Sequence, residues 1–132
     1  MEIIEYRTYR EEDILPLYAS VGWTAYTDAP DALRRGFEKS LLTLAAYEGK
    51  TLVGLARAVG DGETVVLVQD LLVFPQYQRL GVGTALLRAV MERFADVRQL
   101  QLVTDDTKKT LAFYHSLGLR ELSAFGCRGF MR

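Results

Sequence analysis

A glycine-bearing turn between an apolar strand and a helix is the feature that most constrains this sequence. The apolar run 71–75 leads into Gln-Arg-Leu-Gly-Val-Gly at positions 78–83, and residues 84–91 then have the composition of a helix. The first amides of a helix have no partner within it, and the helix dipole adds partial positive charge there. Gly81 and Gly83 lack the β-carbons that would keep a ligand's phosphates away from these amides. The segment therefore predicts an anion site at a helix N-terminus.

Two better-known phosphate-binding motifs do not fit this turn. A Walker loop needs a glycine, four residues and then Gly-Lys-Ser or Gly-Lys-Thr, and the turn has no such pattern. A dinucleotide fingerprint needs a third glycine where this sequence has Leu86, and it belongs to the first strand of a parallel unit. The remaining alternative is a plain helix entry whose glycines serve tight packing. The apolar strand and the segment 75–79 favour a ligand site over that alternative.

The order Gln-x-x-Gly-x-Gly after a buried strand resembles the acetyl-CoA pyrophosphate loop of the GNAT superfamily of N-acetyltransferases. Residues 113–119, Phe-Tyr-His-Ser-Leu-Gly-Leu, resemble the family's Tyr-x-x-x-Gly-Phe ending, with Leu119 in place of phenylalanine. The resemblance covers nearly the whole chain in its order of elements, but only the segment 69–83 is specific.

The resemblance implies that acetyl-CoA is the acetyl donor and that it lies over this turn and the strand before it. Backbone groups of Leu72, Val73 and Phe74 are expected to pair with the pantetheine arm and to hold the thioester carbonyl as its oxygen gains charge. The pyrophosphate is expected on the turn, where Arg79 either adds a cation or is a solvated surface arginine. The residues of this expected donor site are Gln78, Arg79, Leu80, Gly81, Val82, Gly83 and Thr84.

Tyr114 is the candidate general acid, because the family places a tyrosine at this point of its last long helix. A phenol with a pKa of about 10 keeps a proton available for the departing thiolate at neutral pH. A core aromatic is the alternative, since Leu111 and Tyr114 share a helix face. Two positions depart from the family pattern: Thr107 replaces a frequent asparagine and Thr110 a frequent alanine.

Asp70 is the best candidate for a base that deprotonates the acceptor amine, because it lies two residues before the expected pantetheine segment. It is alternatively a structural acceptor or an electrostatic partner for a cationic substrate. For the acceptor itself, Trp23 and Tyr26 are expected to wall an apolar or aromatic amine pocket, with Asp28 or Asp70 attracting its charge. Trp23 as a cover for the core is an equal alternative.

Composition bounds the remaining possibilities. A chain of 132 residues suits one domain, 1–132, and its net charge of −1 gives no electrostatic footprint of a nucleic-acid binder. The N-terminus lacks the layout of a signal peptide, and no apolar stretch approaches 18 residues, so the cytoplasm is expected and no membrane partner. Cys127 and His115 are single residues of their kinds, which makes a metal site unlikely to form. Cys127 is expected to be buried, and His115 to lie on the surface.

The periodicity of apolar residues gives the order β-α-α-β-β-β-α-β-α-β, with the tail 119–131 forming one or two closing strands. The segment 23–31 is expected to be a loop. This order is that of the GNAT fold, an α/β (α+β) architecture. It implies a mixed, mostly antiparallel sheet of six to seven strands, splayed between strands 4 and 5 and flanked by about four helices.

These observations predict an N-acetyltransferase that moves acetyl from acetyl-CoA to a primary amine by direct attack in a ternary complex. The alternative is a GNAT-like module that senses acyl-CoA without turnover. The acceptor is a small molecule or a peptide amine, whose identity the sequence leaves open, as it does the oligomeric state.

Overall fold

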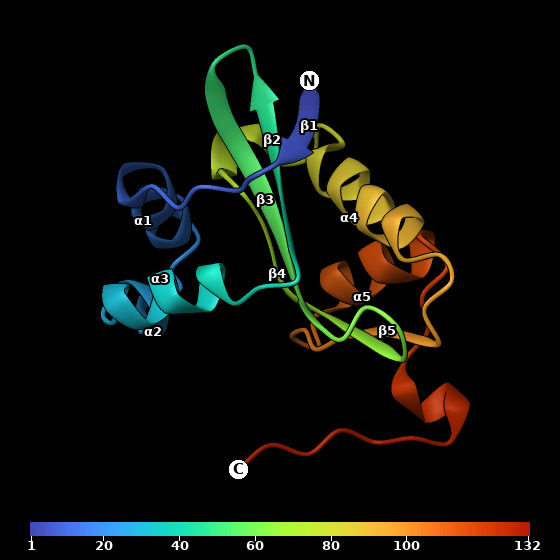
Figure 1. The fold of residues 1–132 in the computed structure, drawn as a ribbon. Coiled ribbons are helices and arrows are strands. Elements are labelled where there is room, and N and C mark those ends of the chain that lie inside the picture. The colour runs from blue at the N-terminus through green and yellow to red at the C-terminus, as the bar shows by residue number, and fades with distance from the viewer.

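Five strands in chain order, β1-β2-β3-β4-β5, form the sheet of the computed structural model, which describes residues 1–132 (Figure 1). The first four strands are antiparallel to their neighbours, whereas β5 runs parallel to β4. The strands are β1 Glu2–Glu5, β2 Leu42–Glu48, β3 Thr51–Gly60, β4 Val65–Val73 and β5 Gln99–Leu102. The mixed, mostly antiparallel sheet is thus confirmed.

Helices cover both faces of this sheet, α1 to α3 on one face and α4 and α5 on the other (Figure 1). The helices are α1 Glu11–Ser20, α2 Thr24–Thr27, α3 Pro30–Glu38, α4 Val82–Arg93 and α5 Lys108–Ser116, with 3₁₀ turns η1 Pro75–Tyr77 and η2 Leu122–Phe125. Each face has its own apolar cluster, one around Ile14, Leu17 and Tyr18 and one around Leu86 and Leu87. Burial on both faces explains why β3 and β4 are apolar along most of their length.

The sheet opens between β4 and β5. The two strands pair only from Val65 to Val68 on β4 and from Gln99 to Leu102 on β5. Beyond Val68, β4 continues to Val73 and stays paired with β3 alone. The expected splay between the fourth and fifth strands is therefore present, and it leaves one edge of β4 without a strand partner.

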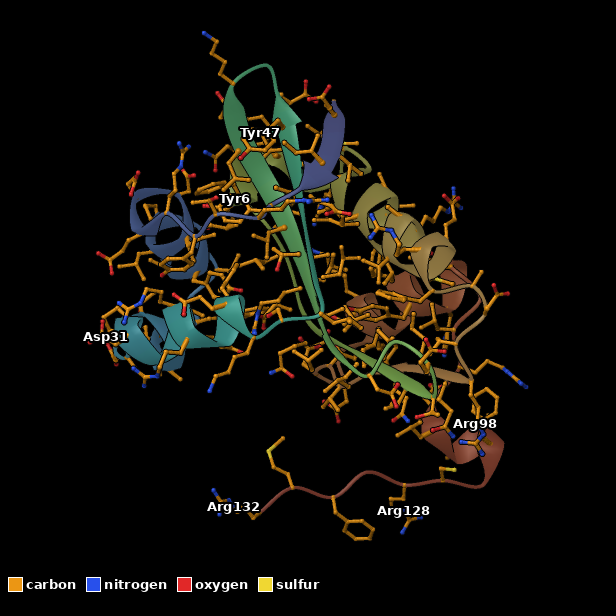
Figure 2. The ribbon with its side chains drawn as sticks, viewed as in Figure 1. Tyr6, Asp31, Tyr47, Arg98, Arg128 and Arg132 are labelled. Atoms are coloured by element: carbon orange, nitrogen blue, oxygen red, sulfur yellow. The ribbon has the colours of Figure 1, made fainter.

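The number of strands is smaller than expected. Residues 119–131 form no strand: η2 takes Leu122–Phe125, and the segment that follows runs along the outside of the molecule (Figure 2). Gly118 and Gly126 have positive φ angles of 86° and 73°, which interrupt an extended path at both ends of this short stretch. Phe130 is 94% exposed, and Cys127 is exposed rather than buried as expected.

Two further segments differ from simple expectations. The segment 23–31 contains the one-turn helix α2, so five helices are present instead of about four. The tripeptide 49–51 has the Gly-Lys-Thr letters that end a Walker loop, but it forms the β2–β3 hairpin turn. Leu44, in the middle of β2, occupies the place where such a loop needs its first glycine.

Candidate active site

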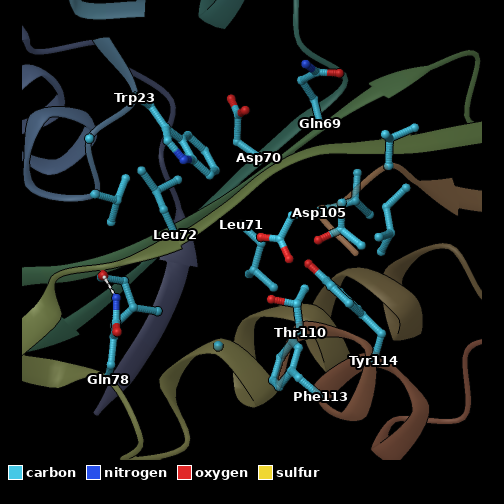
Figure 3. Close-up of a pocket in the computed structure, with 18 of the residues that line it drawn as sticks. Trp23, Gln69, Asp70, Leu71, Leu72, Gln78, Asp105, Thr110, Phe113 and Tyr114 are labelled. Atoms are coloured by element: carbon cyan, nitrogen blue, oxygen red, sulfur yellow. Dashed lines mark hydrogen bonds between the residues drawn. The ribbon is translucent and has the colours of Figure 1, made fainter. Parts of the chain in front are cut away.

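The opening between β4 and β5 forms a cavity with a volume of about 1140 Å³ (Figure 3). We call it the wedge cavity. Its walls come from four places: the connection from α1 to α2, the β4 edge, the turn before α4, and α5 with the end of β5. Segments distant in sequence therefore meet in one concave site, which is the usual form of a small-molecule site.

The turn before α4 exposes unpaired amides to this cavity. Gly81 is the N-cap of α4 with a φ of 85°, and no side chain caps the helix. The N–H groups of Val82, Gly83 and Thr84 have no hydrogen-bond partner within the protein, and the first amide bonded across the turn is that of Ala85. The predicted anion site at a helix N-terminus is therefore open.

The two glycines of the turn serve different needs. Gly81 requires a left-handed backbone that side chains rarely adopt, although a β-carbon there would touch nothing within 4 Å. Gly83 has ordinary helical geometry, and its β-carbon would lie 3.6 Å from the Phe113 ring, an ordinary contact. The fold itself therefore does not require a glycine at position 83. Its missing β-carbon leaves space at the wall of the cavity, next to the free amides.

Gln78 fixes how the turn leaves β4. Its side-chain Nε2 donates to the carbonyl oxygen of Val73 at 3.0 Å (Figure 3). Arg79 follows with a φ of 64°, a left-handed conformation that is costly for a residue with a β-carbon. Strained backbone of this kind concentrates at functional sites, so it supports a ligand role for the turn. The contact between Gln78 and Val73 was not predicted from the sequence.

The free edge of β4 points its backbone groups into the wedge cavity at alternate residues. The Val73 carbonyl faces this side, because Gln78 reaches it there, and the pleat places Leu71 on the same side. Leu72 borders the cavity, but its side chain packs in the cluster around α1. Phe74 does not line the cavity: its N–H donates to the Val53 carbonyl at 2.9 Å and its ring packs on the α1 side. Of the three residues expected to hold the thioester, Val73 is the best placed.

Not every residue of the turn directs its side chain into the wedge cavity. Leu80 is 70% exposed and Val82 is buried in the core, and neither side chain lines the cavity. Arg79 does line it, together with Lys109 of α5, and neither cation has an ion-pair partner. Two positive charges without an ion-pair partner thus border the site, and the Asp105 carboxylate lines it as well. Lys109 was not among the expected residues, because only the fold brings the first turn of α5 to this cavity.

Tyr114 lines the wedge cavity from α5, and its hydroxyl points toward the space beside β4 (Figure 3). Thr107 caps this helix by accepting from the Thr110 amide at 3.3 Å, so the threonine at this position still performs a capping role. The Phe113 ring packs edge-on against the Tyr114 ring, with the two ring centroids 5.0 Å apart. Burial raises the pKa of the Tyr114 hydroxyl above its ordinary value, and the nearby Asp105 charge adds to this, while Thr104 acts in the opposite direction. The phenol therefore holds its proton at neutral pH.

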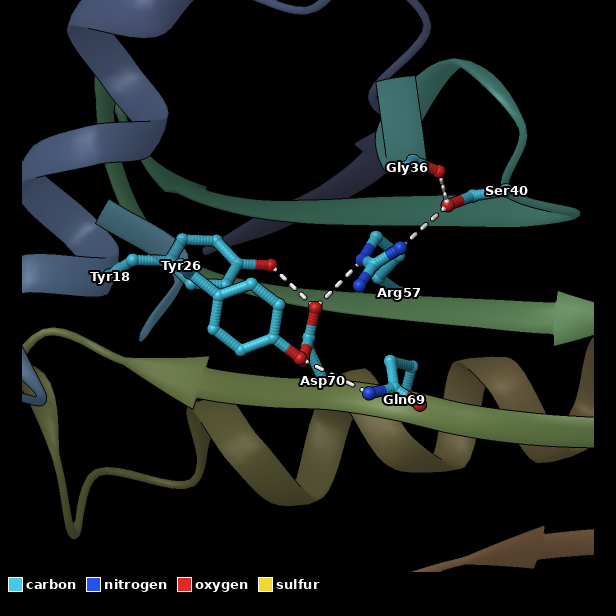
Figure 4. Close-up of polar contacts among 7 residues, drawn as sticks. All are labelled: Tyr18, Tyr26, Gly36, Ser40, Arg57, Gln69 and Asp70. Carbon is cyan, nitrogen blue, oxygen red and sulfur yellow. Dashed lines mark hydrogen bonds and ion pairs between the residues drawn. The ribbon is translucent and has the colours of Figure 1, made fainter. Parts of the chain in front are cut away.

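Asp70 is one of the residues that line the cavity, and its side chain is held in a hydrogen-bonded network (Figure 4). Its Oδ2 accepts from Arg57 Nε and from the Tyr18 hydroxyl, each at 2.7 Å, and its Oδ1 accepts from the Tyr26 hydroxyl at 2.9 Å. The residue is only 1% exposed. Three donors already occupy the oxygens of Asp70, so this geometry favours the structural alternative for Asp70 over proton abstraction.

The side of the cavity where the acceptor amine is expected is aromatic. Trp23 and Tyr26 both line it, with ring centroids 6.0 Å apart. The Tyr26 hydroxyl also accepts from Gln69 Nε2 at 3.1 Å. Asp28 is exposed at the C-terminal end of α2 and does not line the cavity, so the structure does not bring it to this site. His115 lies on the surface as expected, with its Nε2 2.8 Å from a Glu121 carboxylate oxygen.

No helix is long and apolar enough to cross a membrane. No group of three or more histidine, cysteine, aspartate or glutamate side chains is arranged to hold a metal ion.

Known proteins match this chain closely. The family model described as the acetyltransferase (GNAT) family matches residues 6–119. The GNAT family acetyltransferase SP0256 from Streptococcus pneumoniae TIGR4 is 38% identical and superposes with a TM-score of 0.89, over 99% of this chain and 96% of that chain. The aminoglycoside N-acetyltransferase AAC(6')-Iy, solved with CoA, has a TM-score of 0.75 over 91% of this chain and 88% of its own. At 20% identity it shares the fold alone.

Curated relatives match over shorter parts of their length. GCN5-related N-acetyltransferase 2, chloroplastic, from Arabidopsis thaliana is 36% identical over 84 residues, which are 61% of this chain and 31% of the relative. The uncharacterized N-acetyltransferase ycf52 from Gracilaria tenuistipitata var. liui is 27% identical over 110 residues, 80% of this chain and 59% of the relative. The chain thus spans between about a third and three fifths of the length of these two relatives.

Proposed function

The chain belongs to the GNAT family of acetyltransferases, and on this premise we propose that it transfers an acetyl group from acetyl-CoA to a primary amine by direct attack. The observation that carries the proposal is the wedge cavity. It combines the open N-terminus of α4, the free edge of β4 and the Tyr114 hydroxyl in one site. These are an anion site, a row of backbone donors and a proton donor, which are the groups that acetyl transfer from a thioester requires.

Acetyl-CoA would be held by the turn before α4 and by the β4 edge. The free amides of Val82, Gly83 and Thr84 suit the pyrophosphate, and the space at Gly83 lets phosphates approach them. Arg79 and Lys109 add two positive charges that have no partner in the protein. Backbone groups of Leu71 and Val73 suit the pantetheine arm, which can add to a free edge like a strand. When bound, acetyl-CoA supplies an activated carbonyl carbon and a thiolate leaving group.

The residues of the chain then divide the chemistry between two sides of the cavity. The amine attacks the carbonyl carbon from the side of Trp23 and Tyr26. The β4 amides stabilise the oxygen that gains negative charge, because they are fixed donors in a partly dry site. Tyr114 gives its proton to the departing thiolate, and its raised pKa keeps that proton in place until it is needed. The acceptor is a small molecule or a peptide amine, and the cytoplasm is the proposed location.

One pair of measurements tests this function. Calorimetry should detect binding of acetyl-CoA and CoA, while NAD and ATP bind much more weakly. Release of the CoA thiol should then be followed with a panel of amines: 2-phenylethylamine, butylamine, kanamycin and a lysine-containing peptide. Binding of CoA together with thiol release from at least one amine supports the enzyme. Binding without release from any amine would favour the acyl-CoA sensor, and absence of CoA binding would overturn both.

A further inference from the structure

The Tyr26 hydroxyl accepts a hydrogen bond from Gln69, an exposed side chain that lines the wedge cavity beside it. The hydroxyl donates its hydrogen to Asp70 Oδ1 at 2.9 Å and accepts from Gln69 Nε2 at 3.1 Å (Figure 4). A phenol hydroxyl acts as one donor and as an acceptor, and Gln69 occupies the acceptor position here. Because Gln69 is exposed and lines the cavity with Tyr26, a ligand N–H there can take the place of the Gln69 amide.

The carboxylate below Tyr26 cannot play this part itself. Asp70 is 1% exposed, and its Oδ2 is occupied by Arg57 and Tyr18. The Arg57 charge compensates that of Asp70 at a distance of 2.7 Å. What this part of the wall offers a ligand is therefore a neutral oxygen with a fixed lone pair, and no free negative charge.

We propose that Tyr26 binds and orients the attacking amine by accepting one of its N–H groups, and that Asp70 is the positioning residue that fixes the Tyr26 hydroxyl. The inference rests on the proposed function and adds to it the residue that receives the acceptor. A hydroxyl hydrogen rotates freely unless an acceptor holds it. Asp70 holds this hydrogen, so the accepting side of the Tyr26 oxygen stays directed at the position that the Gln69 amide occupies at the cavity.

This contact fits a primary amine in its neutral form. Such an amine has two N–H groups and one lone pair. One N–H donates to Tyr26, the lone pair forms the bond to the carbonyl carbon, and the second N–H is lost to water as the amide forms. The carbon–sulfur bond breaks, its electron pair stays on sulfur, and the thiolate takes up one proton. Tyr26 ends the reaction unchanged, and an amide and a thiol are the products.

Two tyrosines on the same carboxylate provide a matched test. Tyr26→Phe removes a hydroxyl that faces the cavity, whereas Tyr18→Phe removes one that is fully buried and does not line it. With the amine from the panel that the wild type converts fastest, Tyr26→Phe should lower kcat/KM by about tenfold or more. The KM for acetyl-CoA should stay near the wild-type value. Tyr18→Phe should lower the melting temperature more than Tyr26→Phe does, and kcat/KM much less.

A double-mutant cycle tests the positioning role of Asp70. If Asp70 acts on the amine only through Tyr26, Asp70→Asn lowers kcat/KM in the wild-type background and causes no further loss in Tyr26→Phe. A purely structural role would lower kcat/KM equally in both backgrounds and would overturn this part of the proposal. Tyr9→Phe is the control for loss of a tyrosine hydroxyl, because that hydroxyl is buried without a hydrogen-bond partner and lies outside the cavity.

The outcomes separate this inference from the proposed function. A wild type that acetylates an amine, together with a Tyr26→Phe variant of equal kcat/KM, overturns the inference alone. Equal losses of kcat/KM in Tyr26→Phe and Tyr18→Phe would also overturn the inference. Both hydroxyls would then act through Asp70, and Tyr26 would not contact the amine directly. A wild type that releases no thiol with any amine overturns the proposed function and the inference with it.

Discussion

Arg57 and Asp70 occupy paired positions on β3 and β4, and Arg57 Nε lies 2.7 Å from Asp70 Oδ2 in a nearly solvent-free ion pair. Burial alone would lower the pKa of Arg57, but the Asp70 charge and hydrogen bond outweigh it and hold that pKa above its ordinary value. Arg57 also donates to Ser40 Oγ at 3.2 Å and lies 5.3 Å from the centre of the Phe37 ring. The pair therefore connects the acceptor wall of the cavity to the end of α3.

Removing one partner of this pair should destabilise the protein strongly, because it leaves a buried charge without compensation. Arg57→Met and Asp70→Asn should each lower the free energy of unfolding by about 3–5 kcal/mol. In the double variant, the free energy of unfolding should fall by less than the sum of the two single losses. Urea unfolding of the four proteins measures this, and additive losses would show that the two side chains do not depend on each other.

Gly81 and Gly118 allow a comparison of backbone strain with ligand binding. Their φ angles are 85° and 86°, and neither would place a β-carbon within 4 Å of another atom. Alanine at either position should therefore cost a similar free energy of unfolding, about 1 kcal/mol. Only Gly81 lines the wedge cavity, so only Gly81→Ala should weaken CoA binding. Equal CoA affinity in both variants, measured by calorimetry, would place the pyrophosphate elsewhere.

Gly83 should show stability and affinity changing in opposite directions. A β-carbon fits there at 3.6 Å from Phe113, and alanine in a helix restricts the unfolded chain more than glycine does. Gly83→Ala should thus unfold with equal or higher free energy. Gly83→Val should weaken CoA binding about tenfold or more, roughly 1.4 kcal/mol. Thermal melts and calorimetry on the same samples test this, and unchanged CoA affinity in folded Gly83→Val would contradict it.

Tyr114→Phe should separate catalysis from binding. The change keeps the ring and its edge-on contact with Phe113 at 5.0 Å but deletes the proton donor. Turnover should fall by about 10²-fold or more while CoA affinity changes little, because the lost proton matters mainly in the transition state. Tyr47→Phe, on β2 and outside the cavity, is the control. A fully active Tyr114→Phe variant would remove Tyr114 from the mechanism.

The pH dependence should follow the acceptor amine. Two carboxylates line the cavity: Asp70 is paired to Arg57, and hydrogen bonds from Thr107 lower the pKa of Asp105, so we expect neither to set the rise of kcat/KM with pH. The rise should therefore shift when a less basic amine is used. Burial raises the pKa of Tyr114 above its ordinary value of about 10, so loss of this acid should reduce activity only above that pH. A rise at one fixed pH for amines of different basicity would instead identify an enzyme base.

Local chemistry in the sequence determined the proposed donor side of the site. Gln78, Gly81 and Gly83 lie within six residues, and the helix that follows them needs no distant partner to expose its first amides. Thr107 and Gly118 likewise mark the beginning and end of α5, which places Tyr114 on that helix. These features depend on residues that are close together in the sequence, so they can be predicted without knowledge of the fold.

Tertiary structure decided the proposed acceptor side of the wedge cavity and the conformation of the tail 119–131. Asp70 gains its partners from residues 13, 44 and 52 positions away, Arg57, Tyr26 and Tyr18, so its role depends on which strands and helices pack together. Lys109 reaches the wedge cavity because β5 and α5 diverge from β4. The apolar tail 119–131 has strand-like composition, but a strand also needs an edge to pair with in the right direction, and composition cannot supply that partner.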